Sequence, residues 1–166
     1  MLTLQRNHLL PTRIDVSRTA REELVAVLNQ QLADVFDLYS QTKQAHWNVR
    51  GPHFYSLHEL FDRIAGELLT FLDDIGERIT ALGGVALGTV GLAAKATRLP
   101  ECALEETDGM PLVSELADRF GAVASTTREA IEVAEAHHDA VTADLLTEVT
   151  RGLDKNLWFL EAHARS

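Results

Sequence analysis

Apolar residues recur at steps of three and four along four stretches of the chain, a pattern that predicts four amphipathic helices. We expect the first helix to begin at Ser17, where Thr19 and Glu22 have the spacing of a capping box. Arg50-Gly51-Pro52 ends this helix, because glycine and proline disfavour the helical backbone. Its buried stripe is Leu28, Leu32, Val35, Tyr39, Thr42 and His46.

The other three helices follow from the same periodicity. The second begins near Phe54 and ends at Gly83-Gly84. The third begins near Pro111, which suits the first turn of a helix, and ends at the turn His137-His138-Asp139. The fourth runs from about Val141 to Ala162. The core stripe of the second helix is Leu57, Phe61, Ile64, Leu68, Phe71, Ile75, Ile79 and Leu82.

A connection of unusual length, from residue 83 to about 109, separates the second and third helices. Within it, Thr89 to Lys95 is rich in alanine and leucine, which favours a short helix. We therefore expect an all-α four-helix bundle, residues 17–166, with a short extra helix in one long crossover. Residues 1–16 read as a flexible tail closed by Pro11. The tail holds no lysine, and its basic residues are Arg6, His8 and Arg13.

Five residues of metal-binding type lie at or near helical spacing in the first half of the chain: His46, His58, Asp62, Asp73 and Glu77. His58 and Asp62 are four residues apart, as are Asp73 and Glu77, so each pair shares one helix face. Eleven residues separate Asp62 from Asp73, or about 16 Å of helix. Two metal ions in one site lie about 4 Å apart, so one copy of the helix cannot bring both pairs together.

A second, antiparallel copy of the helix could join the two pairs. A two-fold axis near residues 67 and 68 would set each His58/Asp62 pair against the partner's Asp73/Glu77 pair, giving two equal sites in an isologous interface. Gly66 lies beside that crossing, where a missing side chain allows close approach. The alternative is that both pairs are solvated on a surface helix and that His46 is a core histidine.

Two long motifs resemble the signatures of the Dps family, ferritin-like mini-ferritins named for DNA protection in starved cells. The first is His46-Trp47-Asn48-Val49-Arg50-Gly51 with Leu57-His58 and Asp62. The second is Leu72-Asp73-Asp74-Ile75-Gly76-Glu77-Arg78, followed by Leu82-Gly83-Gly84-Val85-Ala86. The resemblance extends to residues 153–160 and covers nearly the whole chain.

This resemblance implies a ferritin-like bundle that assembles into a hollow homo-dodecamer. It implies a ferroxidase, which oxidises Fe(II) mainly with hydrogen peroxide and stores ferric oxide, protecting the cell from oxidative damage. His46, His58 and Asp62 of one subunit would hold two iron ions with Asp73 and Glu77 of its two-fold mate. Imidazole and carboxylate ligands also suit zinc, a competing occupant without redox chemistry. Trp47 beside the site would quench radicals or simply pack.

Four further features have less support as functional sites. Some relatives carry additional histidines at the oxidation site, so His163 is either an extra ligand or a surface residue. Asp144, and less clearly Asp139, match acidic residues that line the iron-entry pores of the family; the alternative is a helix cap or a solvated face. Glu135-x-x-His138 has the spacing of an intra-bundle di-iron motif, but it occurs once and at a helix end, so we read it as surface.

Charge and composition bear on the choice between metal binding and nucleic-acid binding, and on the cellular compartment. The formal net charge of −10 suits a protein that attracts cations, although solubility alone explains it, and it disfavours broad nucleic-acid binding. DNA compaction with a secondary metal site is therefore the rival function, and an interaction protein with solvated acids is a second rival. Cys102 has no internal disulfide partner, and no apolar run spans a membrane, which predicts a cytoplasmic protein, nucleoid-associated if it binds DNA.

Overall fold

The computed structural model describes residues 9–103 and 105–164, and in that part of the chain it contains five helices and no strand. The helices are α1 (Arg18–Asn48), α2 (Phe54–Ala81), α3 (Val90–Ala96), α4 (Gly109–Ala136) and α5 (Ala140–Ala164). The predicted all-α four-helix bundle with a short extra helix in the crossover is confirmed. Within the same residues, no helix is long and apolar enough to cross a membrane.

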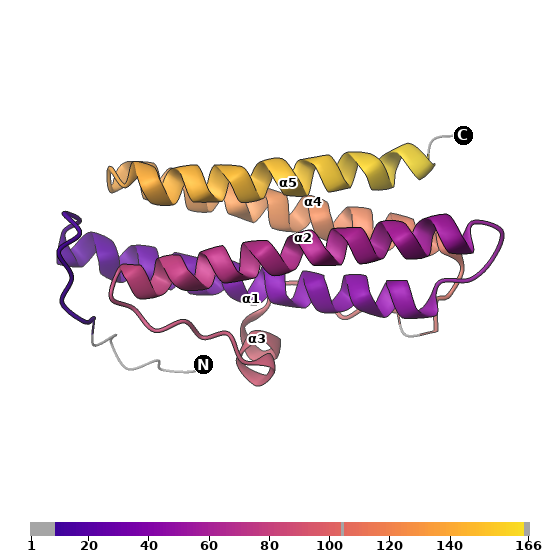
Figure 1. The fold of residues 1–166 in the computed structure, drawn as a ribbon, viewed down its shortest axis with the longest axis horizontal. Coiled ribbons are helices and arrows are strands. Elements are labelled where there is room, and N and C mark those ends of the chain that lie inside the picture. Colours follow the sequence, from indigo (N-terminus) through magenta and orange to yellow (C-terminus); the bar gives the residue numbers. More distant parts are fainter. Residues whose placement is uncertain (1–8, 104, 165–166) are drawn as a thin grey trace.

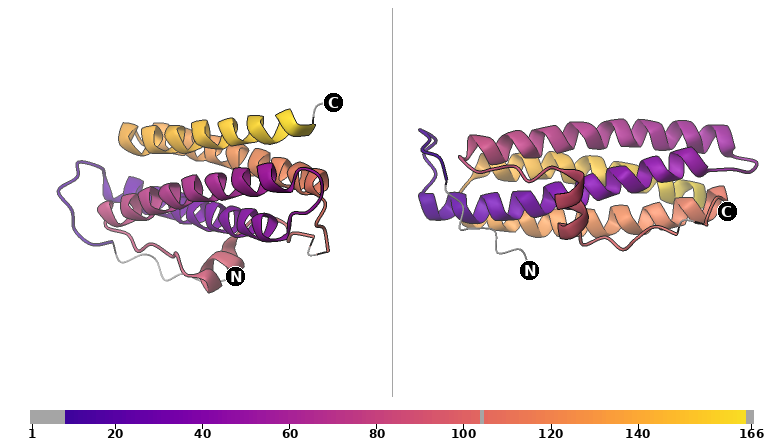
Figure 2. Two further views of the ribbon diagram at one scale, coloured as in Figure 1. Left: turned by 45° about the vertical axis from the view of Figure 1, so that its right-hand side comes forward. Right: turned by 90° about the horizontal axis from the view of Figure 1, so that it is seen from below.

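The four long helices lie along one axis as two antiparallel pairs, α1 with α2 and α4 with α5 (Figure 1). The crossover returns along the length of the bundle, so α4 starts at the end where α1 finishes (Figure 1). There the backbone N–H of Arg50 donates to the carbonyl of Thr107 at 2.8 Å. The short helix α3 lies across the outer side of α1 (Figure 2). This end of the bundle therefore brings together the α1–α2 turn and the start of α4.

Apolar stripes from all four long helices fill one continuous core. The predicted stripe of α2 is fully or nearly fully buried from Leu57 to Leu82. Gly152 lets α5 approach α2 closely, because a β-carbon at this position would overlap the ring of Phe71. Burial of these stripes fixes how each helix is rotated about its axis. It thereby fixes which side chains of α2 remain on the outer face.

The predicted capping box at the start of α1 is wrong. Ser17 is the N-cap, and its hydroxyl accepts a hydrogen bond from the backbone N–H of Ala20 at 3.2 Å. Thr19 lies inside the helix, and Glu22 pairs instead with Arg18 at 3.0 Å. Serine and threonine both cap helices well, so the spacing to an acidic residue favoured the wrong one of two nearby candidates.

Polar side chains of α1 hold the crossover in place. Asp34 is buried, and its carboxylate accepts from the backbone N–H and the guanidinium of Arg98. Asn29 donates to the carbonyl of Val85 and accepts from the N–H of Leu87, while Gln41 donates to the carbonyl of Pro100. These bonds satisfy backbone groups that a connection without regular structure would otherwise leave unpaired.

The segment before α1 also lies against the bundle from Leu9 onward. Leu9 is buried, and the N–H of Leu10 donates to the carbonyl of Gly83 at 2.8 Å. The guanidinium of Arg21 donates to the carbonyls of Leu10 and Leu82. The flexible tail predicted for residues 1–16 includes residues 1–8, which lie outside the described residues, and for that part it stays a prediction.

Candidate metal centre

Two histidines face each other where α1 ends and α2 begins. The rings of His46 and His58 stack with their centroids 3.8 Å apart and their planes 20° apart. Nδ1 of His46 lies 2.8 Å from the carbonyl oxygen of His58, and Nδ1 of His58 lies 2.9 Å from the carbonyl oxygen of His46. The two bonds tie the last turn of α1 to the first turns of α2. They also fix the orientation of both rings.

These hydrogen bonds determine which ring nitrogen is available to a metal. A carbonyl oxygen only accepts, so Nδ1 carries the proton in both rings. In the neutral imidazole, Nε2 then keeps its lone pair, the form in which histidine binds metals. Nε2 of His46 lies 3.8 Å from a carboxylate oxygen of Asp62. Three of the five predicted ligands therefore come together at one end of the α1–α2 pair.

Lys43 belongs to the same cluster, although sequence reasoning missed it. Its ammonium lies 2.6 Å from Oδ1 of Asp62 and 5.6 Å from the ring centroid of Trp47. The hydrogen bond from Lys43 holds the pKa of the Asp62 carboxyl below its usual range, and the positive charge of Lys43 acts in the same direction. Asp62 is thus an anion at neutral pH and attracts cations. The signal available in the sequence was that Lys43 lies one helical turn before His46 and Trp47.

Asp73 and Glu77 lie elsewhere on α2. Both are exposed, and the eleven residues from Asp62 to Asp73 correspond to about 16 Å of helix. They share an outer face of α2, the α2 stripe, which consists of Asp62, Gly66, Leu69, Asp73 and Glu77. Leu69 is 49% exposed and nothing lies within 4 Å of a β-carbon added to Gly66. Among the described residues of one chain, no group of three or more histidine, cysteine, aspartate or glutamate side chains is placed to hold a metal ion.

Trp47 is 67% exposed, so it does not pack within the core of its own chain. Its position next to His46 and beneath the Lys43 ammonium places an oxidisable indole at the edge of the cluster. The radical-quenching role stays a prediction. Glu135 and His138, the isolated Glu-x-x-His pair, are both exposed at the end of α4, away from the core.

Asp139 is buried at the start of α5. It accepts two hydrogen bonds from the guanidinium of Arg78, at 2.8 and 2.9 Å, and one from the backbone N–H of Thr142. Burial alone would raise the pKa of Asp139, but hydrogen bonds from Thr142 and Arg78 outweigh it and lower that pKa. This arrangement matches the helix-cap alternative for Asp139. Asp144 is exposed, and its role at a pore stays a prediction.

His163 is exposed near the end of α5, at the end of the bundle where α1 also finishes (Figure 1). Its Nδ1 donates to the carbonyl of Phe159 at 2.7 Å, one turn back along the helix. In the neutral ring the lone pair is therefore on Nε2, as in His46 and His58. Membership of His163 in the site stays a prediction.

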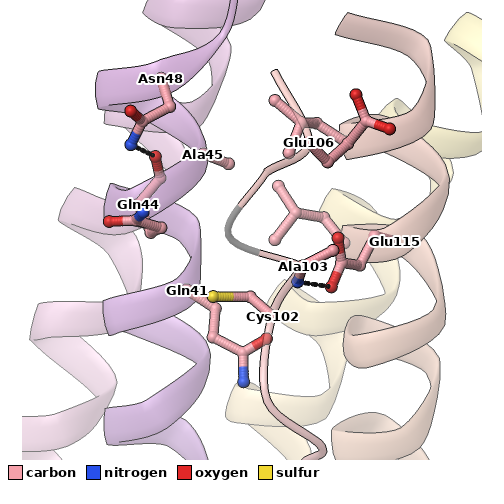
Figure 3. A pocket seen from close by; sticks show the side chains of 10 residues that line it. Gln41, Gln44, Ala45, Asn48, Cys102, Ala103, Glu106 and Glu115 are labelled. Atoms are coloured by element: carbon pink, nitrogen blue, oxygen red, sulfur yellow. Dashed lines mark hydrogen bonds between the residues drawn. The ribbon is translucent and has the colours of Figure 1, made fainter. Parts of the chain in front are cut away.

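A pocket between α1, the crossover and the start of α4 offers no competing site (Figure 3). Its volume of about 20 Å³ holds little more than one water molecule. Cys102 points from the crossover toward α1, as Figure 3 shows, and burial followed by the nearby Glu115 carboxylate raises the pKa of its thiol. The thiol is therefore protonated and unreactive at neutral pH.

Comparison with known proteins agrees with this fold. Residues 25–166 match the ferritin-like domain family. The chain is 40% identical to the DNA protection during starvation protein of Agrobacterium fabrum, over 93% of this chain and 95% of that protein. DpsC from Streptomyces coelicolor superposes with a TM-score of 0.91 at 30% identity, over 95% of this chain and 92% of that one.

A third relative adds a chemical description. The Dps protein of Vibrio cholerae O1 superposes with a TM-score of 0.87 at 27% identity, over 94% of this chain and 98% of that one. That protein is described as a member of a broad superfamily of ferritin-like diiron-carboxylate proteins.

Proposed function

The chain belongs to the Dps family of ferritin-like proteins, and from this membership we propose that it oxidises Fe(II) and stores the ferric product inside a hollow homo-dodecamer. One observation carries the proposal. In the neutral rings of His46 and His58 the Nδ1 contacts leave the lone pair on Nε2, and Nε2 of His46 lies 3.8 Å from the Asp62 carboxylate. Imidazole and carboxylate ligands of this kind suit Fe(II) and also Zn(II), which would occupy the site without being oxidised.

The second half of the site comes from another subunit in this proposal. Two α2 helices crossing antiparallel near residues 67 and 68 would set Asp73 and Glu77 of one chain against the histidines of the other. The exposure of the whole α2 stripe supports this crossing, since Leu69 is apolar and the space beside Gly66 is open. Each dimer then holds two equal sites.

Two Fe(II) ions in one site supply the two electrons that hydrogen peroxide needs. The balanced step takes two Fe(II), one peroxide and two protons to two Fe(III) and two water molecules. The O–O bond breaks with both electrons delivered together, so no hydroxyl radical is released. In this scheme Trp47 captures radicals from occasional one-electron events at the edge of the site.

Several relatives are named for DNA protection, which raises the rival function of DNA compaction. The formal net charge of −10 opposes contact with a polyanion. We therefore propose that this chain protects the cell chemically, by removing Fe(II) and peroxide together.

Mixing two inactive variants tests the shared site. One variant carries His58→Ala and Asp62→Asn, and the other carries Asp73→Asn and Glu77→Gln; all four positions are exposed or half-buried, so the fold should survive. Each alone should oxidise iron slowly. In a mixed dimer one site regains all its ligands, so co-assembly with random pairing should restore roughly one quarter of the wild-type activity.

Asp74→Asn is the matched control, because Asp74 is exposed on α2 but lies off the stripe. It should oxidise iron at the wild-type rate with or without mixing. Failure to recover activity in shells shown by native mass spectrometry to contain mixed dimers would refute the shared site.

A further inference from the structure

Phe54, the first residue of α2, lies against the ring of His58. The two ring centroids are 5.2 Å apart and the ring planes are tilted by 34°. The ring of His46 already stacks on one face of His58 at 3.8 Å. Two rings side by side in one plane would lie farther apart than 5.2 Å, so Phe54 covers the face of His58 that is turned away from His46. The rings of His46, His58 and Phe54 therefore form one stack.

Phe54 has no comparable place in the interior of the bundle. Its side chain is 46% exposed, and among the described residues the apolar core does not include it. Phe54 and His58 are four residues apart, so the helix itself holds the two side chains on one face. The contact with His58 is thus a local feature of the first turns of α2, separate from the packing that forms the fold.

We propose that Phe54 is a positioning residue that strengthens metal binding by His58. This inference rests on the proposed function, because it assumes that His58 is a ligand. A metal on Nε2 draws electrons from the imidazole, so the ring becomes more positive. The face of a phenyl ring carries partial negative charge and attracts a positive ring. The contact is therefore stronger in the metal-bound state than in the free state, and this difference raises the affinity.

The position of His46 makes this effect useful. His46 and His58 are both proposed ligands, so both rings become more positive when the site fills. Two positive rings 3.8 Å apart repel each other. Phe54 lies on the opposite face of His58 and offsets part of that repulsion. It also limits rotation of the His58 ring out of the hydrogen bond to the carbonyl of His46.

Calorimetric titration with Zn(II) tests the proposal without using catalysis. Zn(II) binds imidazole and carboxylate ligands and is not oxidised. Phe54→Leu keeps an apolar side chain and removes the ring face, so it should bind Zn(II) about two- to tenfold more weakly, the range expected for one aromatic contact. Phe54→Tyr keeps the ring and should stay within about twofold of the wild-type affinity.

Fluorination of the Phe54 ring separates its charge distribution from its shape. Monofluoro-, difluoro- and trifluorophenylalanine, incorporated at position 54, remove negative charge from the ring face in steps while the ring keeps its size. The affinity for Zn(II) should fall with each added fluorine. These proteins also decide the question if Phe54→Leu alters the assembly seen by native mass spectrometry, because fluorine changes the packing of the ring very little.

Tyr55→Leu is the matched control, because Tyr55 is the next aromatic residue of α2 and is 72% exposed. Its ring is not part of the stack on His58, so its loss should leave the affinity for Zn(II) unchanged. The control shows whether removing any aromatic ring from the start of α2 affects binding.

The possible outcomes separate the role of Phe54 from the metal site itself. Equal affinity throughout the fluorinated series, or equal weakening by Phe54→Leu and Tyr55→Leu, would overturn the role of Phe54. Wild-type protein that binds no Zn(II), or a His58→Ala variant that binds it as tightly as wild type, would instead refute the metal site.

Discussion

At the scale of single residues, two hydrogen bonds to backbone carbonyls determine which histidine nitrogen can bind a metal. His46 and His58 each give the Nδ1 proton to the carbonyl of the other, and this fixes the tautomer in which Nε2 is free. Spacing in the sequence predicted that these residues were ligands. It could not predict the tautomer, because the two carbonyls lie twelve residues away along the chain.

Trp47 provides a prediction at this scale. Trp47→Phe should leave the oxidation rate within about twofold of wild type and the unfolding free energy within about 0.5 kcal/mol, because the side chain is 67% exposed. Loss of the more easily oxidised indole should instead raise the yield of hydroxyl-radical adducts during oxidation by peroxide, measured by spin trapping.

Trp158→Phe is the control for this measurement, since Trp158 is 58% exposed on α5 and is not among the residues around Asp62. It should give the wild-type radical yield. An equal yield from Trp47→Phe and wild type would contradict the radical-quenching role of Trp47.

Lys43 shows what the sequence could not reveal about the site. A lysine on a helix usually reads as a solvated charge, and only the fold brings it within 2.6 Å of Asp62, nineteen residues away. Asp139 differs from Lys43, because the sequence already offered two roles for it. A single aspartate before a helix is consistent with either a cap or a pore, and the choice depends on whether Arg78 reaches it.

At the scale of helices, the Arg78–Asp139 ion pair joins the last turn of α2 to the start of α5. The side chains are 12% and 3% exposed, so solvent screens the pair weakly. Arg78 follows Glu77 directly, so the side chain that reaches Asp139 and the exposed Glu77 side chain lie on different faces of α2. The buried ion pair at this end of the bundle therefore lies off the α2 stripe.

Asp139→Asn should destabilise the protein by about 3 kcal/mol at pH 7, because it leaves Arg78 buried without a counter-charge. Since the folded-state pKa of Asp139 is lowered, its contribution is present above the unfolded value of about 3.9 and is lost as pH falls through the folded pKa. The gap between wild type and variant should therefore narrow below about pH 4.

Urea denaturation at fixed protein concentration measures both effects. Asp144→Asn serves as the control, because Asp144 is exposed on the same helix and its change should stay within about 0.5 kcal/mol. A gap that stays constant from pH 7 to pH 3 would show that the charge of Asp139 is not the cause.

Helix positions were predictable because burial imposes a period that the sequence displays. The path of the crossover could not be predicted in this way. Asn29, Asp34 and Gln41 lie off the predicted stripe of α1, and each holds a backbone group or side chain about 60 residues away. Polar residues that bind a distant loop have no periodicity of their own, so only the folded chain identifies them.

At the scale of the whole molecule, one chain holds two halves of different sites in the proposed assembly. His46, His58 and Asp62 lie together, while Asp73 and Glu77 share their helix face about 16 Å away. The helical rise was enough to infer from the sequence that one copy of α2 cannot bring both pairs to one site. The symmetry that supplies a second copy is a property of the assembly, and the mixing experiment addresses it.

The last prediction concerns DNA. The chain has 15 basic and 25 acidic residues, so an assembly of identical subunits multiplies a net negative charge. Each phosphate contact needs a basic group and releases counterions, and binding built on few such groups weakens steeply with salt. We expect no submicromolar binding to duplex DNA at about 150 mM salt in gel-shift titrations. Replacing Glu22 and Glu23, exposed acids near the start of α1, with lysine should strengthen binding at low salt. Tight binding by the wild type at that salt would mean that assembly gathers arginines into a basic patch, and DNA compaction would then become the better account of the protein.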